Sequence, residues 1–463
     1  MAHQSGGVLF LRVEDTDAKR EVPGAVEVLI NTLKHYGIHF DEGATIDGDS
    51  GAYGPYRQRQ RAAIYHVYAK QLVLQGDAYP CFCTEEELTA MRAEQEAKKV
   101  NFGYYGEYAV WRDRPIEDVE AAIAAGKPWV LRFRSTGSIE NKFKYSDLVK
   151  GTLTVTENDI DQVLLKSDGI PTYHFAHVVD DHLMGITHVV RGSEYLSSAP
   201  KYNLLYEGFG WEVPTYVHCS PVMRDAQHKM SKRNGDPSYE DLKAQGYLTP
   251  AILNYVALLG WSPRGEQSEQ EFFTLDELVG AFDIGGISKS PAIFDIEKLT
   301  YFNANYLRNL PPEEFCKVAE PYIRQAVKNE AYSVGEIAAL LQARCEKLTD
   351  IPEKVDFFDA LPEYGVEFYT NKKSKTNSEV SLDMLNKVLP KLESLPEWTN
   401  DAIHDMLVSF AEELGVKNAT LMWPLRIAVA GKLVTPGGAV EICHILGREE
   451  TIKRVKAGIA KLA

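Results

Sequence analysis

The sequence predicts an α/β fold with buried parallel strands, followed by an all-α C-terminal region. Residues 8–13 and 186–190 are nearly continuous apolar runs, which are typical of parallel strands covered on both faces. A charged turn follows each run, and an amphipathic helix pattern comes after the first turn. From Pro311 onward the pattern is one of helices with short connections. The chain therefore combines an open α/β domain with a separate helical region.

Length and composition place the chain among soluble globular proteins, and its 463 residues favour about three domains. Hydrophobic residues make up 44% of the sequence, yet no apolar run approaches the ~18 residues of a membrane span. No membrane partner is expected, and residues 1–7 lack the pattern of a signal peptide. Six cysteines over this length form no disulfide framework, so the sequence predicts a reducing, cytoplasmic setting.

The net charge of −16 argues against sequence-blind binding of nucleic acid, because counterion release needs a basic surface. An acidic body can still carry a local basic stripe that grips one RNA. The composition therefore leaves a specific RNA partner open.

The first charged turn is Glu14-Asp15-Thr16-Asp17, directly after the first apolar run. A helix is expected next, with Pro23 near its first turn and Gly37 at its C-terminal cap. In open α/β sheets the ligand crevice lies beyond the carboxyl ends of the strands, so Glu14 and Asp15 would face it. The alternative is that this acidic run only caps the following helix.

Two further charged segments follow predicted strands in the second half of the α/β region. A helix is expected from Tyr173, and the run at 186–190 releases Arg191-Gly192-Ser193-Glu194-Tyr195. A further strand at 215–219 precedes a Lys-rich loop. We expect all three charged turns to line one crevice at the carboxyl ends of the strands.

That loop reads Lys229-Met230-Ser231-Lys232-Arg233 and lies close to Gly235. Clustered cations beside a glycine and small polar residues predict a mobile loop that grips a polyanion, because an ammonium group is a compact point charge for phosphates. The alternative is a solvated basic loop. A second cationic run, residues 56–61, suits phosphate contact and base stacking, although a solvated helix start is the plainer interpretation.

Two sets of residues invite a metal interpretation. Cys81 and Cys83 could begin a zinc site, but the next cysteine is Cys219, and two semi-buried thiols are the favoured interpretation. His174 and His177 have a spacing that allows a shared metal, but hydrogen-bonded histidines that line a pocket explain them better. The sequence therefore predicts no metal ligands.

Taken together, these motifs resemble those of bacterial glutamyl-tRNA synthetases, which are class I aminoacyl-tRNA synthetases. The resemblance covers nearly the whole chain. The matching motifs are residues 11–17, 166–169, 171–174, 179–182, 190–192, 229–233, 424–426 and 435–437.

The resemblance implies a Rossmann-type class I synthetase catalytic domain, N-terminally truncated and split by an α/β insertion, followed by an all-α anticodon-binding region. The expected parts are 1–75, the incomplete first part of the catalytic domain; 76–160, the acceptor-binding connective insertion; 161–235, the second part with the Lys-rich loop; 236–310, a stem-contact helical segment; and 311–463, the helical anticodon-binding region with a break near residue 395.

The resemblance also implies the reaction. The glutamate carboxylate attacks the α-phosphate of ATP, giving glutamyl-adenylate and pyrophosphate, and the glutamyl group then passes to the 3′ end of tRNA(Glu). Lys229 and Lys232 are the expected catalytic residues, with Mg²⁺ sharing the pyrophosphate charge. The expected partners are ATP, L-glutamate and tRNA(Glu), and the chain is expected to act as a monomer.

Site roles carry over residue by residue. The resemblance implies that Glu14 holds the substrate ammonium, that Arg191 binds a substrate carboxylate and that Tyr173 hydrogen-bonds the glutamate. His177 stands among these glutamate-binding residues where a smaller polar partner is expected. The ATP-binding residues implied by the resemblance are Lys229, Met230, Ser231, Lys232, Arg233 and Glu194.

Three departures from the family pattern bear on activity. The His-x-Gly-His signature expected before residue 8 is absent, so we expect a truncation point or false start at Met1 and little or no ATP–pyrophosphate exchange. The alternative function is then a non-catalytic tRNA-binding remnant of the enzyme. Neither the Cys nor the His of the zinc-binding members stands at residues 106–110, so zinc is not expected. The anticodon-reading residues, and whether tRNA(Gln) is also charged, stay open.

Overall fold

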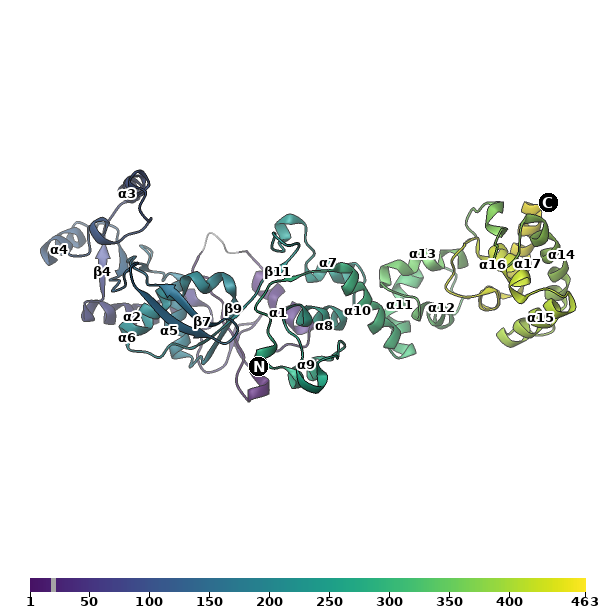
Figure 1. Cartoon of the computed structure of the whole chain (residues 1–463), viewed down its shortest axis with the longest axis horizontal. Helices are drawn as coiled ribbons and strands as arrows, with labels where there is room; N and C mark the ends of the chain where they lie inside the picture. Colours follow the sequence, from purple (N-terminus) through teal and green to yellow (C-terminus); the bar gives the residue numbers. More distant parts are fainter. Residues whose placement is uncertain (18–21) are drawn as a thin grey trace. The chain divides into compact units, whose positions relative to one another are not determined.

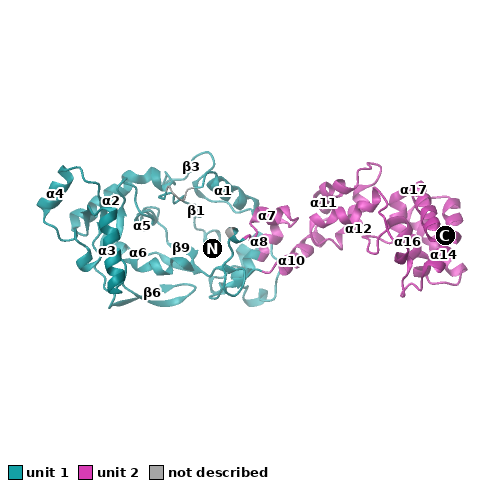
Figure 2. Ribbon diagram, turned by 90° about the horizontal axis from the view of Figure 1, so that it is seen from above, with its two compact units in different colours: residues 1–234, 256–294 teal, residues 235–255, 295–463 magenta. Residues whose placement is uncertain are grey.

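The computed structural model describes residues 1–17 and 22–463. These residues form two compact units (Figures 1 and 2). Unit 1 comprises residues 1–234 and 256–294, and unit 2 comprises residues 235–255 and 295–463. Unit 1 holds the strands and the candidate site, and unit 2 is helical.

A mixed sheet in unit 1 has the order β7-β6-β10-β9, made by His188–Gly192 (β9), Thr215–Cys219 (β10), Lys142–Asp147 (β6) and Gly151–Thr156 (β7). Strand β10 runs parallel to both β9 and β6, and β6 and β7 form an antiparallel pair. The strand predicted at 215–219 is confirmed, and the one predicted at 186–190 starts two residues later. Arg191 therefore lies within β9 and not in the turn after it.

The first predicted strand is shorter than expected, because Phe10–Leu11 (β1) alone pairs in parallel with Glu42–Ala44 (β2), which pairs with Asp49–Ser50 (β3). Strands β1 and β9 belong to different sheets, so their charged turns do not leave the same sheet edge. Helix α1 (Ala25–His35) has Gly24 at its N-cap and no side-chain cap, so the acidic run does not cap it.

A separate sheet of unit 1 has the order β4-β5-β8. Val163–Leu165 (β8) lies antiparallel to Val130–Phe133 (β5), which pairs with Ala78–Cys81 (β4). The remaining elements of unit 1 are α2 (Ala62–Gln75), α3 (Glu85–Lys98), α4 (Ile116–Ala124), α5 (Tyr173–Leu183), α6 (Ala199–Phe209), α9 (Leu275–Ala281), β11 (Val222–Met223) and β12 (Ala292–Ile293).

The core of unit 1 lies where α2, α5 and α6 pack on β5 and β8. Fully buried side chains from these helices include Leu72, Val178 and Leu205. Helix α2 ends at Gly76, which adopts φ 86°, a left-handed conformation that only glycine takes readily. This core holds α5 in place, and α5 carries several site residues.

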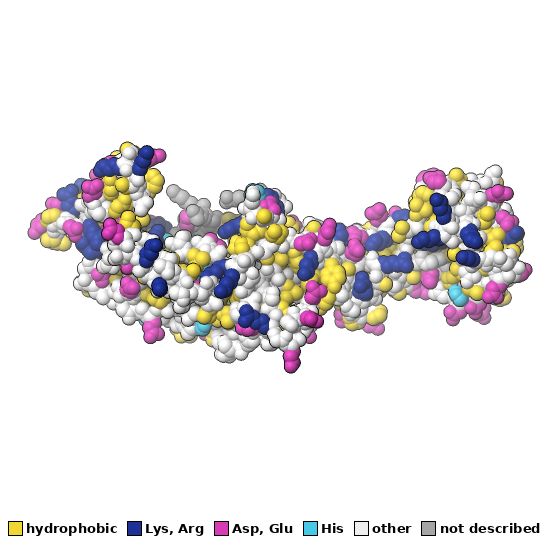
Figure 3. Space-filling view, viewed as in Figure 1, with side chains coloured by type: hydrophobic (Ala, Val, Ile, Leu, Met, Phe, Trp, Pro, Cys, Tyr) yellow, Lys and Arg dark blue, Asp and Glu magenta, His cyan; other side chains and the backbone are white. Residues whose placement is uncertain are grey.

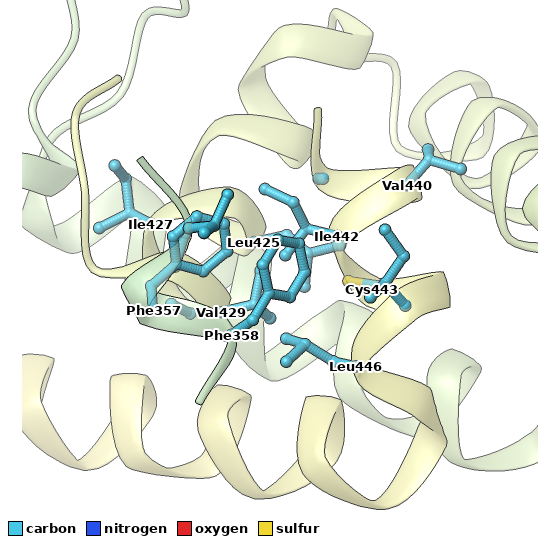
Figure 4. Close-up of a cluster of buried hydrophobic side chains, with 14 of the residues drawn as sticks. Phe357, Phe358, Leu425, Ile427, Val429, Val440, Ile442, Cys443 and Leu446 are labelled. Atoms are coloured by element: carbon cyan, nitrogen blue, oxygen red, sulfur yellow. The ribbon is translucent and has the colours of Figure 1, made fainter. Parts of the chain in front are cut away.

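Unit 2 is built from helices that bury one continuous apolar cluster, part of which Figure 4 shows. Phe357, Phe358, Leu425 and Ile442 are completely buried in it. Helix α17 has a break at Gly447, where φ is 76° and ψ is 168°. The helices are α7 (Tyr239–Ala244), α10 (Ile296–Asn309), α11 (Pro312–Ala326), α12 (Val334–Gln342), α13 (Ile351–Val355), α14 (Ser378–Ser394), α15 (Asn400–Glu413), α16 (Asn418–Ala430) and α17 (Ala439–Leu462), and α8 (Thr249–Gly260) begins here.

Within the described residues, no helix combines the length and the apolar composition that crossing a membrane requires.

Candidate active site

The guanidinium of Arg191 lies at the centre of a buried cage. Its Nε–H donates to Nε2 of His218 at 3.1 Å, and Nδ1 of His218 is 2.7 Å from a carboxylate oxygen of Asp147. Both terminal nitrogens of Arg191 are buried and have no hydrogen-bond partner among the described residues. A guanidinium whose two terminal nitrogens have no partner presents two parallel N–H donors. The two oxygens of a carboxylate can accept both of these hydrogen bonds. Aromatic rings surround the guanidinium, with centroids 4.7–5.2 Å from its carbon: Tyr195, Tyr202 and Tyr216.

Helix α5 brings His177 to this cage. The His177 ring meets the Tyr202 ring edge to face, with centroids 4.3 Å apart. Nδ1 of His177 is 3.1 Å from the Asp181 carboxylate, one helical turn later, and Nε2 is buried without a partner among the described residues. A carboxylate can only accept hydrogen bonds, so Nδ1 of His177 donates to Asp181, and Nε2 of His177 remains to bind a ligand. The sequence did not indicate that Asp181 orients His177, although the i, i+4 spacing was visible.

The acidic turn joins the same site through Arg12. Arg12 pairs with Glu14 at 3.0 Å and with Asp181 at 2.8 Å. Burial alone would raise the pKa of the Asp181 carboxyl, but the Arg12 charge and the His177 hydrogen bond outweigh it and lower the pKa. The Tyr173 ring lies beside the His177 ring, with centroids 5.2 Å apart, and burial followed by the negative charge of Glu14 raises the pKa of Tyr173. Glu14, Tyr173, His177 and Arg191 therefore come together.

The neighbouring Asp180 anchors this arrangement from the core side. It is completely buried and accepts hydrogen bonds from Arg61 at 2.7 Å, Tyr65 at 2.7 Å and Gln58 at 3.1 Å. Gln58, Arg61 and Tyr56 are themselves buried. Gln58 and Arg61 of the run at 56–61 therefore face a buried acid and not solvent, whereas Arg57 and Arg59 are half-buried and Gln60 is exposed.

The Lys-rich loop lies on a separate short strand pair. Lys229 bridges back to Met223 of β11, and the backbone N–H of Met230 donates to Val222 at 3.2 Å. Lys229 and Lys232 are exposed, and within the described part of the chain they form no ion pair and no hydrogen bond to the Arg191 cage. The side chain of Arg233 lies outside the described residues.

Glu194 is exposed in the first turn of a 3₁₀ helix, Ser193–Ser198. Its carboxylate folds back toward Gly192, close enough that a side chain at Gly192 would collide with it. Glu194 therefore lies three residues after Arg191 in sequence and is exposed on the surface.

The residues weighed as metal ligands make other contacts. Among residues 1–17 and 22–463, no group of three or more His, Cys, Asp or Glu side chains is placed to hold a metal ion. Cys81 and Cys83 both contact the hydroxyl of Tyr104, at 3.4 and 3.6 Å. Burial, and then Lys201, lower the pKa of His174 to about 4, which favours a neutral ring near neutral pH.

Comparisons with known proteins agree along the whole chain. Residues 1–301 match the family described as tRNA synthetases class I (E and Q), catalytic domain, and residues 314–459 match an anticodon binding domain. A glutamate–tRNA ligase of Clostridium tetani is 50% identical over 463 residues, covering 100% of this chain and 92% of that protein. One of Clostridium acetobutylicum is 48% identical, with 100% and 93% covered.

Solved structures show the same likeness. The crystal structure of a glutamate tRNA ligase from Elizabethkingia meningosepticum, in complex with its amino acid, has a TM-score of 0.88 and 32% identity, covering 99% of this chain and 94% of that one. The glutamate–tRNA synthetase of Elizabethkingia anophelis has a TM-score of 0.86 at the same identity and coverage. The chain has a class I α/β catalytic domain followed by a helical anticodon-binding domain, and it belongs to the glutamate–tRNA ligase family of aminoacyl-tRNA synthetases.

Proposed function

We propose that this chain activates L-glutamate with ATP and transfers the glutamyl group to the 3′ end of tRNA(Glu). This proposal replaces the expectation of little or no ATP–pyrophosphate exchange, because relatives about 50% identical along the chain are glutamate–tRNA ligases. The observation that carries the proposal is the buried, unpartnered fork of Arg191. Burying a cation without a partner is costly, and a ligand carboxylate removes that cost by accepting both donors. The side-chain carboxylate of glutamate supplies this group.

The other site residues suit the remaining parts of glutamate. Glu14 is 31% exposed and can take the substrate ammonium while Arg12 keeps its pair with Asp181. Tyr173 and Nε2 of His177 complete the polar lining of the cage, within a wall of aromatic rings. Glutamine would leave the Arg191 charge uncompensated, so the cage selects glutamate by the penalty of an unpaired buried cation.

The ATP side of the site is assigned to the Lys-rich loop. Lys229 and Lys232 are exposed ammonium groups that can follow the charge that builds on pyrophosphate as it leaves. Met230, Ser231, Arg233 and Glu194 complete the proposed ATP-binding set. Mg²⁺ binds mainly to phosphate oxygens and water, so it would arrive with ATP and neutralise part of the same charge.

We assign tRNA(Glu) as the partner of both units. On the face drawn in Figure 3, Lys and Arg side chains gather over the C-terminal helices, although the chain as a whole is acidic. Such a local basic surface supports binding of one specific RNA. We further propose that the chain works as a monomer, and in the cytoplasm because its six cysteines, all among the described residues, form no disulfide in the fold. Light scattering at working concentrations tests the monomer.

The test is glutamylation of tRNA(Glu) by the full chain with ATP, compared with Arg191→Gln and Arg191→Lys. Removing one partner of a buried ion pair costs about 2–5 kcal/mol, or roughly 30- to 4000-fold. Both variants should lose glutamate activity by factors in this range. Glutamine removes the positive charge, and lysine keeps the charge but lacks the two parallel N–H donors of the guanidinium. Unchanged glutamate use by Arg191→Gln would refute the assignment. Retained tRNA binding without any glutamyl transfer by the parent chain would support the non-catalytic alternative.

A further inference from the structure

Cys81 and Cys83 share one hydrogen-bond partner. Cys81 closes strand β4, and its sulfur is 3.4 Å from the Tyr104 hydroxyl oxygen, while the sulfur of Cys83 is 3.6 Å from the same oxygen. Both sulfurs therefore lie in one cluster around this oxygen. Neither thiol belongs to the glutamate or ATP site proposed above.

The surroundings of the pair favour a thiolate. The guanidinium of Arg132 lies 4.0 Å from the centre of the Tyr104 ring. A hydrogen bond from Cys83 lowers the pKa of the Cys81 thiol to about 5 against the opposing effect of burial, and Tyr104 and Arg132 lower it further. The same thiol–thiol bond, and then burial, raise the pKa of Cys83. The pair therefore keeps one proton and one negative charge near neutral pH.

Exposure decides how a reagent reaches the pair. Cys81 is only 1% exposed, whereas Cys83 is half-buried and gives access from its side. Cys219 and Cys316 are also half-buried and serve as control cysteines of similar exposure.

We propose that Cys81 and Cys83 form a redox-active dithiol that a peroxide oxidises to a disulfide. This inference goes beyond the glutamylation function and does not depend on it.

The chemistry balances with hydrogen peroxide as the oxidant. A thiolate attacks one peroxide oxygen, the O–O bond breaks, and the departing hydroxide takes a proton from the solvent to become water. The second sulfur then attacks the sulfenic sulfur, the S–O bond breaks, and the leaving hydroxide takes the remaining thiol proton as the second water. The two sulfurs lose two electrons in total and the peroxide gains them. The second step is intramolecular, so it outruns further oxidation of the first sulfur.

Peptide mass spectrometry of the full reduced chain after graded hydrogen peroxide tests the disulfide. The peptide that carries both cysteines should lose two hydrogens at doses that leave the Cys316 peptide unchanged. In Cys83→Ser, dimedone should trap a sulfenic acid on Cys81, whereas Cys316→Ser should still form the disulfide. Oxidation of Cys316 before the pair, or only separate sulfinic acids on the two sulfurs, would overturn the proposal.

A pH profile of alkylation by iodoacetamide gives an independent readout. For an ordinary thiol of pKa about 8.5, the thiolate fraction, and with it the rate, falls about 80-fold from pH 8 to pH 6. The pair should lose less than twofold over that range, and Tyr104→Phe should restore part of the steep dependence by removing the shared hydroxyl. Circular dichroism checks that each variant is folded. A profile for the pair as steep as that of Cys316 would contradict the shared-proton cluster.

Discussion

Asp147→Asn should weaken glutamate binding without touching the substrate. Asp147 is buried, and one of its oxygens accepts from the backbone N–H groups of Val149 and Lys150 at 2.9 and 2.7 Å. The other oxygen faces the backbone N–H and Nδ1 of His218. Asparagine has one acceptor oxygen for these two positions. If the asparagine oxygen stays with the two backbone groups, the asparagine NH₂ group faces Nδ1 of His218. The ring must then carry its proton on Nε2, where this proton opposes the Nε–H of Arg191.

The size of the effect follows from one buried polar group left without a partner, which costs about 1–3 kcal/mol. At 1.4 kcal/mol per factor of ten, the KM for glutamate should rise about 5- to 140-fold. The kcat should change much less, because Asp147 acts through His218 on the position of Arg191 and contacts no reacting atom.

Steady-state glutamylation of tRNA(Glu) at varied glutamate separates these parameters. Asp383→Asn is the matched control, because it breaks the exposed pair of Asp383 with Lys387 on α14 and should leave KM unchanged. Thermal unfolding monitored in parallel shows whether both variants stay folded. A folded Asp147→Asn enzyme with a glutamate KM within twofold of the parent would refute the reasoning, and so would a loss confined to kcat.

Three further outcomes follow from the same geometry. Lys232→Gln should slow adenylate formation about 10²-fold, or about 3 kcal/mol, with little change in glutamate affinity; an ATP–pyrophosphate exchange rate equal to that of the parent would contradict this role. Because the pKa of Asp181 is lowered in the fold, its stabilisation is complete above its unfolded pKa of about 3.9 and is lost as pH falls through the folded pKa. The free energy of unfolding, measured with urea between pH 3 and 7, should therefore fall less toward acidic pH in Asp181→Asn than in the parent. An equal pH dependence in both proteins would speak against the coupling of Asp181 to Arg12 and His177. Arg61→Met leaves Asp180 without its closest charge partner and should cost about 3–5 kcal/mol of unfolding free energy; a loss below 1 kcal/mol in denaturant titrations would show that Tyr65 and Gln58 suffice.

Local signals in the sequence predicted much of this fold. The end of α2 at Gly76 and the start of α5 at Tyr173 follow from capping residues and helical periodicity, which act within a few residues. Strand pairing is set by distant segments. The parallel character predicted for the runs at 8–13 and 186–190 is confirmed in β1 and β9, but the sequence did not name their partners. An apolar run at 163–165 fits a parallel or an antiparallel neighbour equally well, and the structure pairs it antiparallel with β5.

The candidate site shows the same division. Family motifs predicted Arg191, Glu14, Tyr173 and His177 as one glutamate-binding set, and the structure brings them together, although their roles stay proposals. The supports of this set were invisible in the sequence. His218 and Asp147 come from two strands that are far apart in the chain, and nothing in either segment indicates that they hold Arg191. The partner of a buried charge is chosen by tertiary packing, so a linear pattern cannot name it.

The adjacent acids of helix α5 have a consequence for redesign of amino-acid specificity. Asp180 points to Arg61 and the core, whereas Asp181 points to Arg12 and His177 in the site. A change of substrate from a carboxylate to a neutral amide would call for removal of a positive charge from the cage. Asp180 and Asp181 are each paired with a guanidinium, of Arg61 and of Arg12, so the removal of one charge leaves its partner uncompensated. On the proposed assignment of the site, glutamate specificity should therefore change by coordinated substitutions more readily than by single ones.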